Sequence, residues 1–180
     1  MHQRGFSLIE LLMGLTIAGI VLHLVSPAFA ALAESNYREE AARSLAGGMR
    51  SARSEAIARN QTVVIHSIDG DWGQGWRIIL DISGKGYEDD SNPLIIERRS
   101  GTGVPIFGNR YVKKSVGFGP MGEPVHGGFQ SGTFHICAKR EAVSQHQVVL
   151  APNGRISLRN NKTEVPLCGG NNGSKQGANA

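Results

Sequence analysis

An apolar run at the start of the chain constrains the fold most. From Phe6 to about Ala33 nearly every side chain is apolar, and the ionisable side chains inside the run are Glu10 and His23. About 20 apolar residues at 1.5 Å each cross the hydrocarbon core of a bilayer, so the run predicts one membrane-spanning helix. A carboxylate at this depth costs about 2.5–3.5 kcal/mol, so Glu10 needs a partner. The nearest candidate is a new amino terminus, made by cleavage after Gly5 on this or a neighbouring chain.

The residues around this cleavage site carry a family resemblance. The stretch 5–10 (GFSLIE), followed by an apolar helix, resembles the class III signal of type IV pilins and type II secretion pseudopilins. The resemblance implies that a prepilin peptidase cuts after Gly5 and methylates Phe6. It also implies that Glu10 is the glutamate at the fifth mature position, and that Pro27 is the proline common in the family's helix.

Two other interpretations of the N-terminal run are open. A secretory signal peptide has a similar basic head and apolar core, with an A-x-A cleavage site at Ala28-Phe29-Ala30. An acid at the start of the core is unusual in such a signal, and the helical pattern continues beyond the site. An uncleaved membrane anchor would leave Glu10 without a partner. N-terminal sequencing separates the two cleavage sites. The first residue would be Phe6 after cleavage by a prepilin peptidase and Ala31 after cleavage of a secretory signal peptide.

Charges before the apolar run predict the orientation of the chain. His2 and Arg4 stay cytoplasmic by the positive-inside tendency, which places the residues after the helix outside the inner membrane. Cys137 and Cys168 would then lie in an oxidising compartment and are expected to form one disulfide. Closing a loop of about 30 residues stabilises a fold by roughly 3–4 kcal/mol. Two cysteines without CxxC spacing make a poor zinc site.

The helical pattern continues past Pro27 with a different character. Between Glu34 and Asn60, apolar residues recur in steps of three and four, which predicts one buried stripe of an amphipathic helix. The stripe consists of Ala42, Leu45, Met49, Ala52, Ala56 and Ile57. The charged residues of this segment mostly lie off the stripe, so we expect them to face water. Gly47-Gly48 favours a local bend.

After Asn60 the sequence predicts a β-sheet. Short runs rich in β-branched residues are separated by glycine, proline and asparagine. The runs are 62–68, 76–82, 94–98, 111–118, 133–138, 147–150 and 155–158. Asn153-Gly154, between the last two, is a strong hairpin turn. Without a second helical period, we expect an α+β fold in which an antiparallel sheet packs on the helix stripe.

These patterns predict five segments along the 180 residues. They are a leader at 1–5, a transmembrane and assembly half of the helix at 6–33, its amphipathic half at 34–60, a periplasmic β-rich head at 61–168 and a tail at 169–180. The tail is rich in glycine, asparagine and polar residues, so we expect it to be disordered. One modest domain beyond the apolar helix is what this length allows.

Later segments narrow the resemblance to the FimT/GspH family of minor pilins and pseudopilins. The stretch 52–63 (ARSEAIARNQTV) resembles the family's transition from helix to first strand, and similar segments follow at 75–81, 116–122, 132–137 and 148–156. The resemblance implies a type IV pilin-like fold and a structural role in type IV pilus assembly, serving twitching motility or DNA uptake. It implies prepilin peptidase, other pilins and the inner membrane as partners. A minor pseudopilin of a type II secretion system is the alternative.

No motif in the sequence indicates catalysis or a cofactor. The six histidines lack metal-ligand spacing, and no P-loop, GxGxxG or GxSxG pattern is present. The acidic stretch 81–90 fits a calcium loop poorly, because Lys85 stands where an acidic ligand is needed. We therefore predict a non-enzymatic protein without cofactor or metal.

A basic stretch near the end of the chain is a candidate DNA-binding site. If it is a strand, Arg155, Ser157 and Arg159 share a face, and Lys162 follows. Some FimT-type minor pilins bind DNA through a Gly-Arg-x-Arg motif in this region. Here Gly154 and Arg155 match, but Ser157 replaces the second arginine, and no aromatic side chain is interleaved to stack on bases. A DNA-binding subunit at a pilus tip is the further alternative, against a solvated hairpin.

Overall fold

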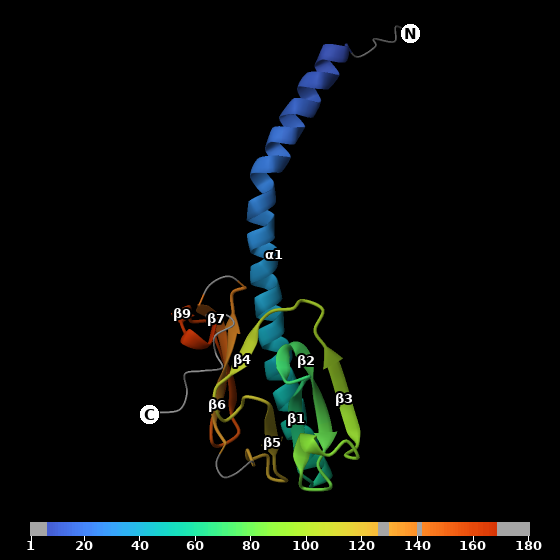
Figure 1. Cartoon of the computed structure of the whole chain (residues 1–180), viewed down its shortest axis with the longest axis vertical. Coiled ribbons are helices and arrows are strands. Elements are labelled where there is room, and N and C mark those ends of the chain that lie inside the picture. Colours follow the sequence, from blue (N-terminus) through green and yellow to red (C-terminus); the bar gives the residue numbers. More distant parts are fainter. Residues whose placement is uncertain (1–6, 126–129, 140–141, 169–180) are drawn as a thin grey trace. The chain divides into compact units, whose positions relative to one another are not determined.

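The computed structural model describes residues 7–125, 130–139 and 142–168, which form one long helix and two antiparallel sheets (Figure 1). Helix α1 runs from Leu8 to Arg59 and includes Pro27. Internal contacts divide the chain into two compact units, Met1–Asn36 and Tyr37–Ala180. Helix α1 therefore begins in the first unit and ends in the second. This arrangement confirms the predicted α+β class.

Both sheets belong to the second unit. Their strands are β1 (Val63–Ile68), β2 (Asp71–Leu80), β3 (Leu94–Arg99), β4 (Ile106–Gly108), β5 (Ser115–Phe118), β6 (Gly132–Cys137), β7 (Val143–Leu150), β8 (Ile156–Arg159) and β9 (Thr163–Glu164). The first sheet has the order β3-β2-β1-β5, and the second has the order β4-β6-β7-β8 with β9 also paired to β7. Every strand pair is antiparallel. Two short 3-10 helices, η1 (Gly86–Glu88) and η2 (Pro166–Cys168), complete the described elements.

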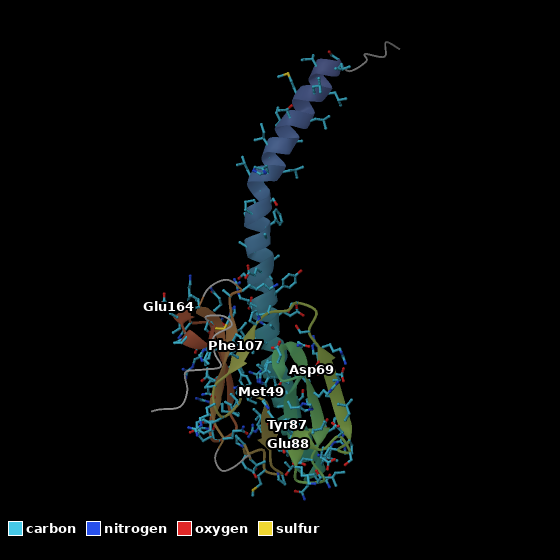
Figure 2. The ribbon with its side chains drawn as sticks, viewed as in Figure 1. Met49, Asp69, Tyr87, Glu88, Phe107 and Glu164 are labelled. Atoms are coloured by element: carbon cyan, nitrogen blue, oxygen red, sulfur yellow. A yellow bond between two sulfur atoms is a disulfide. The ribbon has the colours of Figure 1, made fainter. Side chains whose placement is uncertain are left out.

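In the first unit, α1 has no buried residue between Leu8 and Asn36. Its large apolar side chains are well exposed, from 40% at Val25 to 76% at Leu8, and Figure 2 shows them projecting from this part of the ribbon. Among the described residues, α1 is the helix whose length and composition suffice to cross a membrane. The exposed apolar surface agrees with a segment that needs lipid or other helices around it.

In the second unit, α1 packs one stripe of small and apolar residues against both sheets. The buried positions are Ala42, Leu45, Ala46, Gly48, Met49, Ala52 and Ala56. They share one core with Ile65 and Ile78 of the first sheet and Phe134 and Val148 of the second. The predicted stripe is confirmed except at Ile57, which is 49% exposed. Ile57 lies in the last turn of α1, where it borders the loop at Gly122 rather than a sheet.

Gly48 sets how closely α1 approaches the first sheet. A Cβ atom at Gly48 would lie 2.7 Å from the indole ring of Trp76 on β2, and Trp76 is buried. Helix α1 is continuous through Gly47 and Gly48. Because only glycine leaves space for the ring, Gly48 has a packing role here, although it costs helix propensity.

Arg53 of α1 does not face water as predicted. Arg53 is half-buried, and its Nε donates a hydrogen bond of 2.8 Å to the carbonyl oxygen of Gly122. A Cβ atom at Gly154 would lie 3.0 Å from the same Nε, so Arg53 lies against two turns. Arg50 donates a longer bond of 3.4 Å to the carbonyl of Ile156. These hydrogen bonds connect the helix to distant turns. The periodicity of the helix sequence does not predict such contacts.

The strand predictions are correct in type and partly wrong in extent. Two sheets are present where one was expected. The predicted strand 111–118 is a strand only from Ser115, and β4 and β9 were not predicted because three and two residues show no periodicity. The hairpin at Asn153-Gly154 is confirmed. Leu150 pairs with Ile156, and Gly154 has a φ of 76°, the left-handed conformation that favours glycine.

Candidate functional site

The predicted assembly site lies at the start of α1. Gly5 and Phe6 fall outside the described residues. Glu10 lies in the first turn of α1, where its backbone N–H donates to the carbonyl of Ser7 at 3.0 Å. Its side chain is exposed between Ile9 and Leu11, which are 63% and 61% exposed. A carboxylate in the first helical turn also interacts favourably with the helix dipole.

Glu10 has no cationic partner within the described part of the chain. Ion pairs in that part of the chain include Glu39 with Arg43, Glu55 with Arg59, and Glu97 with both Arg77 and Arg99, and Glu10 belongs to none of these. From Ser7 to Ala33, Glu10 is the only carboxylate and no lysine or arginine occurs. The geometry therefore leaves a carboxylate on an apolar helix segment, available to a cation from another source.

The predicted disulfide between Cys137 and Cys168 is present, with the two Cα atoms 5.4 Å apart. It joins the end of β6 to η2. The segment that follows β8 is therefore tied to the second sheet twice, by this bond and by the pairing of β9 with β7. The two cysteines are 31 residues apart in the sequence. In the chain-entropy model, a disulfide that closes a loop of this length contributes roughly 3–4 kcal/mol to the free energy of unfolding.

The candidate DNA-binding residues lie at the β8 side of the second sheet. Arg155, Arg159 and Lys162 are all exposed. The strand begins at Ile156, so Arg155 belongs to the turn, where its N–H donates to Asn153 Oδ1 at 3.1 Å. Arg159 is on the strand and pairs with Gln147 of β7. Arg155 therefore lies directly before the strand and Arg159 at its end, and both are at the surface.

Hydrogen bonds to a buried asparagine organise the acidic stretch 81–90. Asn92 is 8% exposed, and its Oδ1 accepts the N–H groups of Ile82 and Ser83. Its Nδ2 donates to Asp81 Oδ1 at 3.3 Å and to the carbonyl of Gly86 at 2.9 Å. The sequence alone does not reveal the role of Asn92, whose only local signal is its place in a turn before a proline.

His66 and His135 lie in strands, as expected. His66 is in β1, where its ring stacks on Tyr87 with centroids 5.7 Å apart. His135 is in β6, with Nδ1 3.3 Å from Ser144 Oγ. Burial lowers the pKa of both imidazoles. Within the described ranges, no group of three or more histidine, cysteine, aspartate or glutamate side chains is placed to hold a metal.

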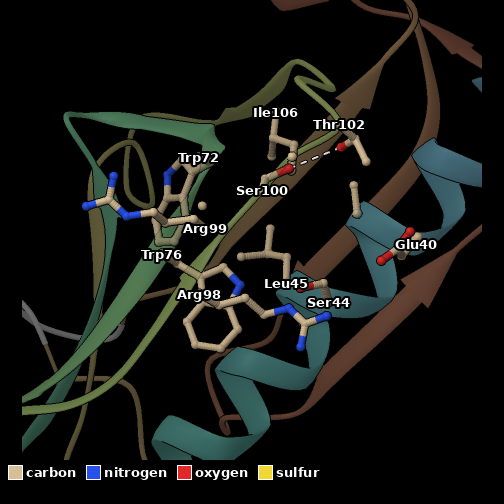
Figure 3. A pocket seen from close by; sticks show the side chains of 13 residues that line it. Glu40, Ser44, Leu45, Trp72, Trp76, Arg98, Arg99, Ser100, Thr102 and Ile106 are labelled. Atoms are coloured by element: carbon tan, nitrogen blue, oxygen red, sulfur yellow. Dashed lines mark hydrogen bonds between the residues drawn. The ribbon is translucent and has the colours of Figure 1, made fainter.

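A small pocket of about 70 Å³ lies between α1, β2 and the segment after β3. Figure 3 shows Trp72 and Trp76 of β2 with Leu45 of α1 around it, and the hydrogen bond of 3.1 Å between Ser100 and Thr102 at its edge. Ligand sites for small molecules usually measure about 300–1,000 Å³. This pocket is therefore a packing defect beside the helix rather than a binding site.

Comparisons with known proteins define the family. A model described as type II transport protein GspH matches residues 41–173, which is most of the chain. A prokaryotic N-terminal methylation motif matches residues 1–26. The chain belongs to the GspH family. Its members are structural pilin and pseudopilin subunits, and the methylation motif implies processing by a prepilin peptidase and assembly with other pilins. No curated protein sequence matches the chain.

Solved structures confirm the fold of this GspH-family protein. The type IV minor pilin FimU of Pseudomonas aeruginosa, in one crystal form, has 23% sequence identity and a TM-score of 0.57, covering 71% of this chain and 92% of the FimU chain. A second crystal form of FimU gives 24% identity, a TM-score of 0.54 and coverage of 67% and 91%. At these identities the similarity shows the shared fold of a long helix on antiparallel sheets.

Proposed function

We propose that this GspH-family protein is a minor pilin of a type IV pilus system, without enzymatic activity. The first half of α1 lies in the inner membrane, the head lies in the periplasm, and the mature subunit later joins the pilus. The observation that carries the proposal is the contrast within α1. Between Leu8 and Leu32 its large apolar side chains are exposed, with the carboxylate of Glu10 near the start, whereas the part from Ala42 to Ala56 carries a buried stripe. The fold shared with a minor pilin and the match to the methylation motif support it.

In the proposed mechanism, Glu10 guides assembly through charge. Cleavage after Gly5 creates a positively charged amine on Phe6. When a neighbouring subunit packs its apolar helix alongside, its amine meets the Glu10 carboxylate, and each charge offsets the cost of burying the other. Removing one partner of a buried pair costs about 3–5 kcal/mol. The pair thus favours one register of the two helices, while the apolar side chains supply the contact area.

The test replaces Glu10 and compares cleavage with assembly. Glu10→Ala is expected to insert into the membrane and to be cleaved, because neither step needs the ion pair. It should be strongly depleted from sheared pili. Glu39→Ala is the matched control, since Glu39 is partly exposed in the second unit and pairs with Arg43 on the same helix. Wild-type incorporation of Glu10→Ala would refute the assembly role.

A gene deletion separates the pilus from a secretion system. A minor pilin deletion should impair twitching or DNA uptake and leave exoprotein secretion intact. The reverse phenotype would assign the protein to a type II secretion system as a minor pseudopilin. The pilus is preferred because the segment 52–57 and the C-terminal cysteine pair resemble FimT-type pilins.

A further inference from the structure

A larger groove lies on the head, between the segment around η1 and the segment before β5. Its volume is about 440 Å³, within the usual range of about 300–1,000 Å³ for ligand sites. The charged and aromatic side chains that define this basic groove are Lys85, Tyr87, Arg110, Tyr111, Lys113 and Lys114. They come from two segments more than 20 residues apart in sequence. Tyr87 and its neighbour Glu88 are labelled in Figure 2.

The groove concentrates positive charge. Its lining includes four cations and one carboxylate, Glu88, so four minus one gives +3, whereas the whole chain carries only +4. Lys85, Arg110, Lys113 and Lys114 are exposed, and none of them forms an ion pair with another described residue. Surface cations of native proteins usually alternate with acids, so this grouping favours an anionic ligand.

Buried hydrogen bonds hold the wall that carries Lys113 and Lys114. Gln130, 4% exposed, donates through Nε2 to the carbonyls of Tyr111 and Ser115. The indole N–H of Trp72 donates to the Lys113 carbonyl at 2.9 Å. The backbone N–H and the hydroxyl of Ser67 both donate to the Lys114 carbonyl. The backbone is therefore fixed while the lysine side chains are left to the solvent.

The opposite wall is fixed in the same way. Asn92 bonds the Gly86 carbonyl at 2.9 Å, and Tyr87 stacks on His66. The buried polar residues of the described chain are Ser67, Asn92, Ser115, Gln130 and Ser144. All of these except Ser144 line the groove or bond its walls. Because burying polar groups is costly, their grouping here indicates that the groove is preorganised.

We infer that the basic groove binds a ligand with clustered phosphate groups. Phosphate oxygens carry dense charge that suits the point charges of lysines and the fork of an arginine. The exposed ring of Tyr111, 64% accessible with the Arg110 guanidinium 6.0 Å from its centroid, offers a face for a sugar or base beside the phosphates. The same chemistry occurs in a free oligophosphate and in a nucleic-acid strand.

The experiment titrates tripolyphosphate into the full chain in nonionic detergent at low salt, by calorimetry. Binding should weaken as salt is added. Lys113→Gln combined with Lys114→Gln should weaken it about a hundredfold or more, since each lost charged hydrogen bond accounts for about tenfold or more. Arg98→Gln combined with Lys139→Gln removes the same charge from exposed positions outside the groove and should leave the affinity unchanged. Glu88→Gln should tighten binding, which no folding defect explains.

The outcomes decide the inference. Absence of tripolyphosphate binding at low salt overturns it, as does equal weakening by the two double variants. Competition by a thymidine oligonucleotide would identify strand phosphates as the ligand, and binding without competition would identify a free oligophosphate. Either result supports the inference that the groove binds clustered phosphate groups. Pilus incorporation of the Lys113→Gln, Lys114→Gln variant should be normal, so failure here is separable from failure of the proposed assembly function.

Discussion

The two halves of α1 belong to one continuous helix but differ in how their apolar side chains are exposed. Between Leu8 and Leu32 the large apolar side chains are at least 40% exposed, whereas Ala42, Leu45, Met49 and Ala56 are at most 1% exposed. The first half is apolar around its whole circumference, and the second half is apolar along one stripe. The first half is therefore suited to contacts outside the chain, while the second half completes the core of the head.

Composition follows the same division. The buried stripe of the second half is mainly alanine, with one leucine, one glycine and one methionine, and Gly48 leaves room for Trp76. Small side chains let a helix lie close to two sheets. The first half uses leucine, isoleucine and valine, whose larger surfaces suit lipid tails and other helices. The same substitution, made once in each half of α1, should therefore affect the stability of the head differently.

The largest expected effect is on the core of the head. Leu45→Ala should lower the free energy of unfolding of the head by about 2–5 kcal/mol, because a buried leucine leaves a cavity. Leu15→Ala, at a position 63% exposed, should not change it. Urea denaturation of the full chain in nonionic detergent, followed by tryptophan fluorescence, measures both. Equal losses from the two variants would contradict the division of α1.

The disulfide should stabilise the head without affecting the first half of α1. Replacing Cys137 and Cys168 together by serine should lower the unfolding free energy of the head by roughly 3 kcal/mol, since the bond restricts the unfolded chain. Membrane insertion through the first half of α1 should be unchanged. Thermal unfolding with and without reductant provides the measurement, and a wild-type protein indifferent to reductant would contradict the prediction.

A smaller effect is expected where α1 is tied to loops. Arg53→Met keeps the aliphatic stem and removes the hydrogen bond to Gly122, which should cost about 1–2 kcal/mol. Arg43→Met is the control, because Arg43 is exposed and forms only a surface pair with Glu39, worth about 0–0.5 kcal/mol. Chemical denaturation of the two variants ranks them. A larger loss from Arg43→Met would show that the Arg53 contact is unimportant.

The smallest effect concerns pH. Burial lowers the pKa of His66 and His135 below the ordinary value of 6.5. Below that value the unfolded chain binds more protons than the folded head, so the head should lose stability as the pH falls through about 6.5 and toward the lowered pKa. His66→Gln should reduce this slope, as measured by denaturation midpoints from pH 7.5 to about 5. An unchanged slope in the double variant with His135→Gln would refute the assignment.

Sequence patterns predicted the elements whose residues follow a regular period along the chain. Steps of three and four residues located the stripe from Ala42 to Ala56, and alternation with turn residues located most strands and the hairpin at Gly154. Ile57 was assigned wrongly because periodicity does not show where a sheet ends. The division into two sheets and the short strands β4 and β9 depend on long-range pairing, for which the sequence holds no local signal.

The candidate sites differ in how far they can be read from the sequence. Glu10 is conspicuous because it interrupts an apolar run, and the cysteines because the chain has only two. The basic groove was not predicted, since Lys85 and the pair Lys113 and Lys114 meet only through folding. Gln130 and Asn92 stabilise it through hydrogen bonds that have no spacing rule. Chemistry assembled from distant loops therefore requires the structure.

The continuity of α1 has a mechanical consequence. The helix is continuous from Leu8 to Arg59, although Pro27 inside it lacks a backbone N–H donor, and its first buried residue is Ala42. Tension applied along the filament axis would thus enter the head through the stripe from Ala42 to Ala56, loading many side-chain contacts at once in shear. We expect such a joint to resist extraction better than a strand peeled from a sheet edge, and single-molecule pulling on Leu45→Ala should show an earlier rupture.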